Sequence, residues 1–596
     1  MSFFTELKRR NVIRMAGLYL VAAWLLTQVA GTVLPMFDAP AWLPRSVVIL
    51  LALGFVPALI FAWVFELTTQ GLKRDAEVDL EQSIAPQTAR RMDRTIIVVL
   101  MCALVYFGVD KFVLAPQRDA RKPAESNAAV QASAKAETGV PAPGHASDAS
   151  IAVLPFVNMS SDKEQEYFSD GLSEELLNLL AQLPQLRVIA RTSSFSFRGK
   201  EADVATIAKA LNVANVLEGS VRKSGNTLRI TAQLIRAIDS SHLWSQTYDR
   251  ELTDVFKVQD EIASEVVAAL KVRLLSNQVI TNSHRSGNIE AYNQYLLGKN
   301  FAERGTMDDA QLAVAAYRRA IALDPQYGAA YAALARLEGF VADRLGDSAG
   351  MDQSLADVEK GIALEPDLAD GYSARAFCRI TFKRDWAGAQ TDLEKALALN
   401  PGDSNAHAGY SSLMRVLGRV PEAIAAARKA IDLDPLRSAS WLQMGRLHNG
   451  TGDFSAARHD LDRALQIAPD SEAAHFHRGV TSLLEGKADD ALADFRKSGR
   501  VYSNAGIAIA EHTLGHAAES QAALEEEITG FAVGAAYQIV QVYAWRGEND
   551  KAFEWLERAL VQRDGGLSFI LIDPLLASLR SDARYPAFLQ KMGLPH

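Results

Sequence analysis

Three prolines, Pro401, Pro435 and Pro469, lie 34 residues apart and constrain the fold of this 596-residue chain more than any other feature. Each is the last residue of a similar six-residue motif: Ala-Leu-Ala-Leu-Asn-Pro, Ala-Ile-Asp-Leu-Asp-Pro and Ala-Leu-Gln-Ile-Ala-Pro. Two earlier copies end at Pro325 and Pro366. A fixed period of this length predicts a stacked array of helical hairpins, and such arrays mostly bind other proteins.

The period resembles that of the tetratricopeptide repeat, a helix–turn–helix unit with small residues where its helices cross. The copy that covers 438–469 matches this pattern best. Gly445 falls on its expected first helix, and Ala457 and Ala464 fall on its second. Small side chains at these positions let two helix backbones approach closely, and Pro469 cannot continue the second helix.

The array is expected to occupy residues 289–596, as roughly seven to nine hairpins of this kind. The unit that ends at Pro366 is 41 residues long, which predicts an insertion in its hairpin. Beyond about residue 500 the period blurs, and Leu575–Leu594 is expected to form a C-terminal cap. A scaffold that binds peptides or proteins is the favoured interpretation, and a plain helical solenoid without a ligand-specific role is the alternative.

Six side chains are candidates for contact with a partner, because the first helices of stacked hairpins line the concave surface of such an array. They are Cys378, Arg415, Leu442, Arg446, Asn449 and Phe476. Arg415 and Arg446 match acidic groups or a peptide carboxylate as ligands. The alternative for each of the six is an ordinary surface residue.

Charge and cysteine content exclude several classes of function. The formal net charge is −9, and residues 1–149 hold 15 Lys/Arg against 13 Asp/Glu, so the acidic excess lies in the rest of the chain. An acidic segment lacks the electrostatic footprint of a nucleic-acid binder. With only Cys102 and Cys378 present, no disulfide framework or cysteine-based metal site is available.

Three apolar runs near the N-terminus predict a membrane domain over residues 1–116. Residues 15–35 and 47–65 contain no charged side chain and are each long enough to cross a bilayer as a helix. The third run, 95–115, spans only if Asp110 and Lys111 lie near the interface. A cleavable signal peptide is the alternative for the first run.

Basic residues set the expected orientation. Lys8, Arg9 and Arg10 precede the first run, and a second basic group lies between the second and third runs. The positive-inside rule then places the N-terminus and the 66–94 loop in the cytoplasm. Three crossings would send the remainder to the far side, so we expect a multi-pass protein of a bacterial inner membrane with a periplasmic C-terminal region.

Residues 117–149 are rich in Ala, Pro and Ser and predict a flexible linker. The following region, 150–275, predicts a compact α/β domain with no catalytic motif. Its strand-like runs are 151–156, 187–190, 213–222, 227–236 and 242–250, and its helical runs are 168–183, 204–211 and 255–274. Ser224-Gly225-Asn226 is a hairpin signal between two of these strands.

The sequence of this domain resembles that of the amino-terminal domain of TolB and of the related FlgO-type domains. The residues that carry the resemblance are Ile151–Phe156, Tyr167–Gly171, Val216–Ser220, Ile230–Leu234 and His242–Tyr248. The resemblance implies a non-catalytic module for contacts between proteins of the cell envelope. In bacterial proteins of similar layout a cyclase, kinase or DNA-binding domain comes first, but residues 1–14 are too short for one.

No catalytic, cofactor or metal site is expected. Ser193, Ser194 and Ser196 lack a Gly-x-Ser-x-Gly elbow or a Ser-x-x-Lys motif, so a solvated loop is the preferred interpretation. His512 and His516 lie four residues apart on an expected helix, but no HExxH pattern accompanies them. The chain is therefore expected to be a non-enzymatic scaffold or sensor anchored in the membrane. The alternative is a regulatory receptor subunit for a separate cyclase, kinase or transcription factor.

Overall fold

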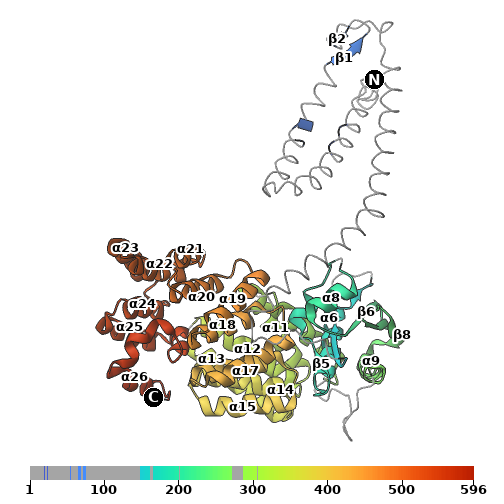
Figure 1. Cartoon of the computed structure of the whole chain (residues 1–596). Coiled ribbons are helices and arrows are strands. Elements are labelled where there is room, and N and C mark those ends of the chain that lie inside the picture. Colours follow the sequence, from blue (N-terminus) through green and yellow to red (C-terminus); the bar gives the residue numbers. More distant parts are fainter. Residues whose placement is uncertain are drawn as a thin grey trace. The chain divides into compact units, whose positions relative to one another are not determined.

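The structure is a computed structural model that describes the chain from residue 148 almost to its end, together with a few residues before it. The described residues are 19, 23, 51, 54, 55, 65–68, 71–74, 148–160, 165–200, 202–270, 286–304, 306–345 and 347–595. The chain forms two units, Met1–Pro143 and Gly144–His596 (Figure 1). The predicted linker, 117–149, lies almost wholly outside the described residues.

The prediction of three transmembrane helices is wrong. In the part of the chain that the structure describes, no helix combines the length and the apolar character needed to cross a bilayer. The predicted multi-pass inner-membrane location and the predicted contact with lipid are corrected with it. Most of the three apolar runs lies outside the described residues, but Phe65, the last residue of the second run, begins a strand. An apolar run predicts burial, whereas a transmembrane span also requires one continuous helix of about 20 residues.

The described strands of the first unit form a small antiparallel hairpin, and the single residues 19, 23, 51, 54 and 55 are helical. Its strands are β1 (Phe65–Thr68) and β2 (Gly71–Arg74), and Phe65 pairs with Arg74. The fold of the second unit is an α/β domain followed by an all-α array, and the array agrees with the predicted solenoid.

The α/β domain is built on a six-stranded mixed sheet with the order β5-β3-β6-β7-β8, in which β4 also pairs with β6. The strands are β3 (Ser150–Val153), β4 (Val157–Asn158), β5 (Arg187–Val188), β6 (Asn215–Ser224), β7 (Thr227–Arg236) and β8 (His242–Glu251). The helices are α6 (Glu166–Ala181), α7 (Arg191–Phe195), α8 (Val204–Leu211) and α9 (Val255–Ala269), with the short turn η5 (Leu252–Asp254) before α9.

Alternation along β3 explains how this sheet is covered on both faces. Ile151 and Val153 belong to the large core that α6 and α9 complete. Ala152 belongs to a second core, which α8 completes with Ile207 and Leu211. Successive side chains of a strand point to opposite faces, so one strand supplies both cores.

The array contains eight helical pairs between residues 289 and 562. They are α10 (Ile289–Ala302) with α11 (Met307–Leu323), α12 (Gly328–Leu345) with α13 (Ser348–Leu364), α14 (Ala369–Cys378) with α15 (Trp386–Leu399), α16 (Ser404–Val416) with α17 (Val420–Leu433), α18 (Ser438–Thr451) with α19 (Phe454–Ile467), α20 (Glu472–Leu484) with α21 (Ala488–Phe495), α22 (Arg500–Leu514) with α23 (Ala517–Phe531), and α24 (Ala536–Trp545) with α25 (Asn549–Gln562). The π-helical turn η6 (Arg379–Lys383) extends α14. The chain closes with η7 (Gly565–Phe569), η8 (Pro574–Ser581) and α26 (Arg584–Lys591).

The small residues of the repeat lie where the helices cross, as predicted. A Cβ at Gly445 would come within 2.6 Å of Leu461 on the paired helix. Ala457 and Ala464 are fully buried. The 41-residue unit does not carry an inserted loop: α12 has 18 residues and α13 has 17, whereas α18 and α19 have 14 each. Longer helices account for its extra length.

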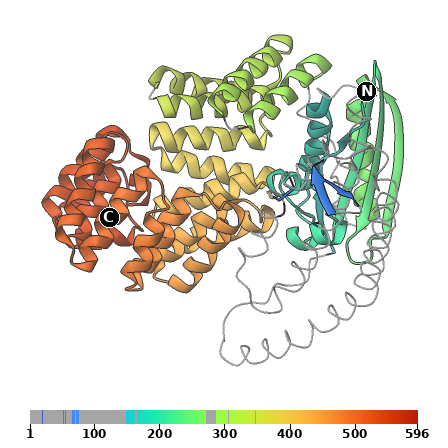
Figure 2. The ribbon, with the colours of Figure 1, turned by 90° about the horizontal axis from the view of Figure 1, so that it is seen from above.

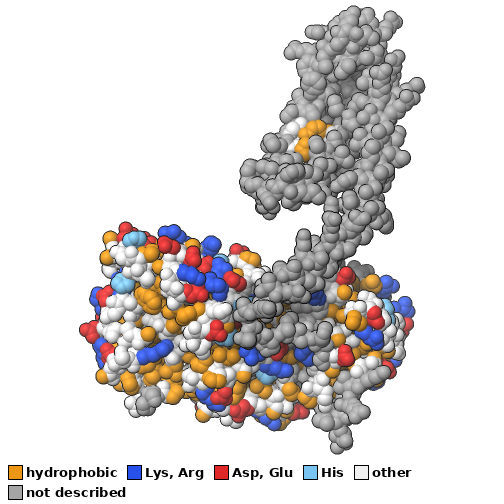
Figure 3. Space-filling view, viewed as in Figure 1, with side chains coloured by type: hydrophobic (Ala, Val, Ile, Leu, Met, Phe, Trp, Pro, Cys, Tyr) orange, Lys and Arg blue, Asp and Glu red, His pale blue; other side chains and the backbone are white. Residues whose placement is uncertain are grey.

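The helical pairs follow one another around a curve, from the green helices α10–α13 to the red ones near the C-terminus (Figure 2). The α/β domain packs against the start of this array, because Leu296 of α10 lies beside Gly171 of α6 and shares its core. A second contact joins the Ala190 backbone N–H to the Leu433 carbonyl, 2.7 Å away. On the face shown in Figure 3, acidic and basic side chains of the second unit are interspersed and form no large basic patch.

Candidate functional site

The concave side of the array is already in contact with the chain's own end. Arg415 of α16 donates a hydrogen bond to the carbonyl of Ser568 in η7, 153 residues later. The guanidinium carbon of Arg415 lies 3.7 Å from the centroid of the Phe569 ring, and that of Arg446 lies 4.8 Å from it. Two of the six predicted partner-binding residues therefore hold the segment 564–576, which we term the closing segment.

Apolar contacts extend this interface along the middle repeats. Ile572 of the closing segment packs in one core with Met414 of α16 and Leu447 of α18. A Cβ on Gly450 would lie 2.8 Å from the Ile572 carbonyl, so only glycine permits this approach. Ile572 is 4% exposed.

Burial lowers the pKa of Arg415 and Arg446, and the Phe569 ring contacts both guanidinium groups. Burial lowers the pKa of Arg415 to about 9, with repulsion from Arg446 as the second cause. Burial also lowers the pKa of Arg446 to about 10. Both groups remain cations at neutral pH, and the negative face of the Phe569 ring attracts them.

The closing segment is a permanent part of the fold. Five of its side chains are at most 4% exposed: Leu567, Ile570, Ile572, Leu575 and Leu576. Burial of each such side chain contributes about 1.5–3 kcal/mol, so exposing all five would cost roughly 7–15 kcal/mol. At this cost the segment stays in place as one side of the binding surface.

A cavity of about 320 Å³ remains between the closing segment and the helices. Three predicted residues line it: Arg446, Asn449 and Phe476. Helices α18, α20, α22 and α24 supply one side, and residues 564–575 supply the other. The lining side chains that sequence analysis did not predict include His477, Tyr502, Tyr537, Gln538, Gln541, Asp564, Phe569 and Asp573. Several of them follow residue 500, where the repeat period blurs and gives no frame.

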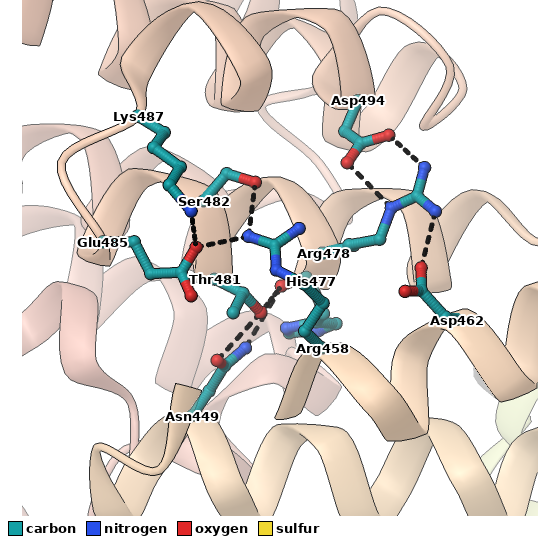
Figure 4. Close-up of polar contacts among 10 residues, drawn as sticks. All are labelled: Asn449, Arg458, Asp462, His477, Arg478, Thr481, Ser482, Glu485, Lys487 and Asp494. Carbon is teal, nitrogen blue, oxygen red and sulfur yellow. Dashed lines mark hydrogen bonds and ion pairs between the residues drawn. The ribbon is translucent and has the colours of Figure 1, made fainter. Parts of the chain in front are cut away.

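Figure 4 shows three sets of polar contacts, of which only the set around Asn449 includes residues that line the cavity. Asn449 donates to the His477 carbonyl at 3.1 Å and accepts from Thr481 at 2.9 Å, so its amide holds α18 against α20. In the second set Arg458 pairs with Glu485, and in the third Arg478 pairs with Asp462 and Asp494, 2.8 and 2.6 Å away. These ion pairs satisfy Arg478, whereas no described carboxylate pairs with Arg446, and its buried Nε has no hydrogen-bond partner.

The other two predicted contact residues lie elsewhere. Cys378 is fully buried, with its sulfur 3.3 Å from the Ser354 hydroxyl, and burial raises the pKa of its thiol. Leu442 packs against the core formed by Ala464, Leu465 and Ala474. Neither lines the cavity.

The serine run near residue 193 is not a solvated loop, so that interpretation is wrong. Ser193 and Ser194 are fully buried in α7. The Ser193 hydroxyl lies 2.5 Å from a carboxylate oxygen of Asp434 in the turn after α17, and it accepts from the Leu436 N–H at 2.8 Å. The nearest partners of this serine are therefore in the array, which no local sequence signal reveals.

A cluster of charged groups joins the α/β domain to the first repeat. Lys299 of α10 lies 2.6 Å from Glu174 of α6, and Arg191 of α7 pairs with both Glu174 and Glu303. Burial opposes the ionised form of Glu174, but Lys299 and Arg191 lower its pKa overall. Burial and the nearby Glu174 charge raise the pKa of Glu303 to about 7.

His512 and His516 do not share one helix: His512 lies in α22, and His516 directly precedes α23. His516 lies 2.7 Å from a Glu511 oxygen, which raises the pKa of the imidazole. Over the described residues, no three His, Cys, Asp or Glu side chains are grouped as metal ligands would be. The arrangement offers hydrogen-bond donors, acceptors and apolar walls for binding.

Comparison with known proteins gives matches to two parts of the chain. Residues 147–265 match the family described as "HilA/YgeH-like transcriptional regulator, second domain". "Putative adenylate cyclase 3" of Rhizobium meliloti (strain 1021) is 37% identical over 221 residues, which cover 35% of this chain and 38% of that protein. "Protein FlbA" of Caulobacter vibrioides is 29% identical over 154 residues, covering 26% and 25% of the two chains. The chain thus spans well under half the length of each of these relatives.

The array also has counterparts among solved structures. The crystal structure of PilW, a "widely conserved type IV pilus biogenesis factor", covers 35% of this chain and 98% of its own, at 20% identity and a TM-score of 0.31. A superposition of that quality carries no argument about function. Residues 382–438 and 442–499 match the tetratricopeptide-repeat family, with which the observed helical pairs and crossing residues agree. This part of the chain is a tetratricopeptide-repeat array.

Proposed function

We propose that this protein is a non-enzymatic scaffold or sensor that binds protein partners through its tetratricopeptide array. The observation that carries the proposal is an apolar groove of about 370 Å³ on α11, α12 and the start of α13. Val314, Ala315 and Val341 are among its lining residues, and the 2.7 Å ion pair between Arg318 and Glu338 also belongs to it. All lining residues come from 310–353, so no other described segment fills the groove.

This groove contrasts with the concave face of α16 and α18, which the closing segment covers. Leu312 and Phe340, from the same two helices as the groove, are 49% and 48% exposed. An apolar groove with exposed apolar side chains on the same helices is typical of an interaction site. The first two repeats are therefore the proposed partner surface, and Arg446, Asn449 and Phe476 remain proposed contact residues through their cavity.

Affinity capture with matched variants tests this proposal. Ala315→Glu places a charge on an exposed position of the groove, and Val561→Glu places the same charge on an 84% exposed position of α25. We expect proteins retained by the intact chain to be lost with Ala315→Glu and kept with Val561→Glu. Equal retention by both variants would exclude the groove, and no retention by the intact chain would exclude the scaffold.

The second candidate is a regulatory subunit for a separate cyclase, kinase or transcription factor. Two similarities favour it: the match of 147–265 to a domain of transcriptional regulators and the identity to a protein named as an adenylate cyclase. This candidate predicts that the purified chain changes the activity of such a partner when added to it. Cyclase activity of the purified chain itself, lost on substitution within 150–275, would contradict the non-enzymatic assignment.

We propose further that 150–275 is a domain of the TolB amino-terminal type that serves protein contacts, and that 289–596 is the array. The mixed sheet with helices on both faces supports a compact α/β module. Its fixed contact with α10 would let a partner on the domain affect the first repeats. Hydrogen exchange in α10 and α11 should slow when a partner binds the domain, and an unchanged rate would separate the two modules functionally.

A further inference from the structure

We propose that the cavity between the array and the closing segment is a binding site for a small monocarboxylate that also carries an N–H donor and an apolar or aromatic side chain. The ligand class is that of an amino acid or its N-acyl derivative. A volume of about 320 Å³ is enough to enclose one such molecule. The site is separate from the groove on α11–α13 and does not depend on a protein partner.

Arg446 supplies the group for the carboxylate. It lines the cavity, no described carboxylate pairs with it, and its buried Nε has no partner. The Phe569 ring lies 4.8 Å from the guanidinium carbon and contacts its face, and stacking of this kind leaves the edge donors available. A planar carboxylate matches that edge with two parallel hydrogen bonds.

Two glutamines supply the acceptors for the N–H donor. Gln541 is 5% exposed, and its Nε2 donates to Asp573 at 2.7 Å, which fixes the orientation of the amide. Its Oε1 is buried without a hydrogen-bond partner, as is the Oε1 of Gln538 one turn earlier on α24. Buried acceptors are rarely left unsatisfied, so these two oxygens indicate a missing donor.

The charges around the cavity favour a single negative charge over a double one. Asp564 and Asp573 also line the cavity, and both are already engaged. Asp564 accepts from the N–H groups of Tyr537 and Gly566, and Asp573 accepts from Tyr537, Gln541 and Leu575. Of the described arginines nearby, Arg446 lines the cavity, whereas Arg415 donates to the Ser568 carbonyl outside it. A phosphate with two charges would therefore face both carboxylates with one cation in the wall, whereas a carboxylate has one charge to place.

Aromatic rings supply the apolar side of the site. Phe476 and Tyr502 lie with ring centroids 5.2 Å apart, and both line the cavity together with Phe569. Rings arranged in this way accept an aromatic or branched aliphatic side chain and exclude a highly polar one. A ligand with a carboxylate at one end and such a side chain at the other therefore satisfies both parts of the wall.

Calorimetric titration of the full chain with three probes tests the site. N-acetyl-phenylalanine carries all three features, its amide lacks the charge, and phenyl phosphate carries a double charge. We expect binding of the first, and binding of the other two at least about tenfold weaker, because a charge-assisted bidentate contact is lost or opposed. Binding of the amide or the phosphate as tight as that of the acid would overturn the carboxylate assignment, and no binding of the acid would overturn the site.

Variants tie the measurement to the cavity. Arg446→Met should weaken binding of the acid about tenfold or more. Gln538→Leu should also weaken it, and it removes no hydrogen bond from the Gln538 Oε1, which has no partner. Arg458→Met, which removes a cation paired with Glu485 outside the cavity, is the matched control. Unchanged affinity in both Arg446→Met and Gln538→Leu, with circular dichroism showing folded protein, would contradict the proposal.

Discussion

The first repeat meets the α/β domain through charged and polar groups as well as a core, whereas the last repeats close over the chain's own end mainly through apolar side chains. At the first contact Lys299, Glu174 and Arg191 form a partly buried cluster. At the second, Ile570, Leu576 and their neighbours lie in a continuous core with α24 and α25. We term these contacts the domain junction and the closure.

The difference bears on what each contact can do. An ion cluster depends on protonation and on geometry, and breaking one partner leaves another charge partly buried. An apolar closure loses energy in proportion to the area exposed, and the closing segment also holds the carboxyls of Asp564 and Asp573, whose pKa burial raises. The strength of the domain junction therefore depends mainly on the charge state of its ion cluster. The closure fixes the shape of the cavity through its apolar packing.

Truncation of the closure should have the largest effect. Ile570 is 1% exposed within the C-terminal core, and Ile570→Ala removes its packing and leaves a cavity, at a cost of about 2–5 kcal/mol. Urea unfolding followed by circular dichroism measures the loss. Val561→Ala, at an 84% exposed site, should change stability by less than about 0.5 kcal/mol. Similar values for both variants would show that the closing segment is only loosely attached.

A buried glutamate should make the stability of the C-terminal repeats depend on pH. Glu527 of α23 is fully buried, neither carboxylate oxygen has a partner, and burial raises its pKa from 4.5 to about 8. The folded state keeps this proton while an unfolded glutamate loses it, so stability falls as the pH rises from 4.5 to 8.

Replacement of this carboxyl by an apolar group isolates the effect. Glu527→Met should stabilise the protein more at pH 8.5 than at pH 5, by roughly 2–4 kcal/mol, since only the wild type must deprotonate or hold a buried charge. Thermal unfolding at both pH values gives the difference. A stabilisation that does not depend on pH would mean that Glu527 gains a solvent path or a partner.

Much of the array could be predicted from the sequence because its contacts are local. Gly445, Ala457 and Leu461 interact within one 34-residue unit, so the period itself reports their packing. The hairpin of β6 and β7 was likewise indicated by the turn at Ser224–Asn226. The prediction of membrane helices was wrong because an apolar run does not by itself specify one continuous helix long enough to span a bilayer, and the described residues contain none.

The candidate site could be predicted only in part, because half of it comes from a distant segment. The repeat frame identified Arg446, Asn449 and Phe476, which do line one cavity. It could not identify Phe569, which meets Arg415 across 154 positions, since no local pattern encodes that pairing. The frame also assigned Cys378 to the surface, although a small side chain beside Ser354 fits the helix packing equally well.

The domain junction should respond to the loss of a single cation. Lys299→Met removes the 2.6 Å pair with Glu174 and leaves that carboxylate with Arg191 alone. We expect a loss of about 2–3 kcal/mol, below the full value for a deeply buried pair because both side chains keep 14–17% exposure. Differential scanning calorimetry should show separate transitions for the domain and the array. Lys257→Met, which removes an exposed ion pair with Asp254, is the control. Its unfolding transition should match that of the wild type.

The smallest effect is expected at a separate polar contact, which joins α7 to the turn after α17. A variant there distinguishes a structural serine from a reactive one. Ser193 binds Asp434 through both its N–H, at 3.0 Å, and its hydroxyl. Ser193→Ala keeps the N–H contact and removes the hydroxyl from both Asp434 and the Leu436 N–H, which should cost about 1–2 kcal/mol. Ser196→Ala, whose hydroxyl meets only a carbonyl within α7 and its cap, should cost less. If Ser193→Ala instead left stability unchanged and abolished reaction with a serine-directed probe, the serine would have a chemical role that its burial argues against.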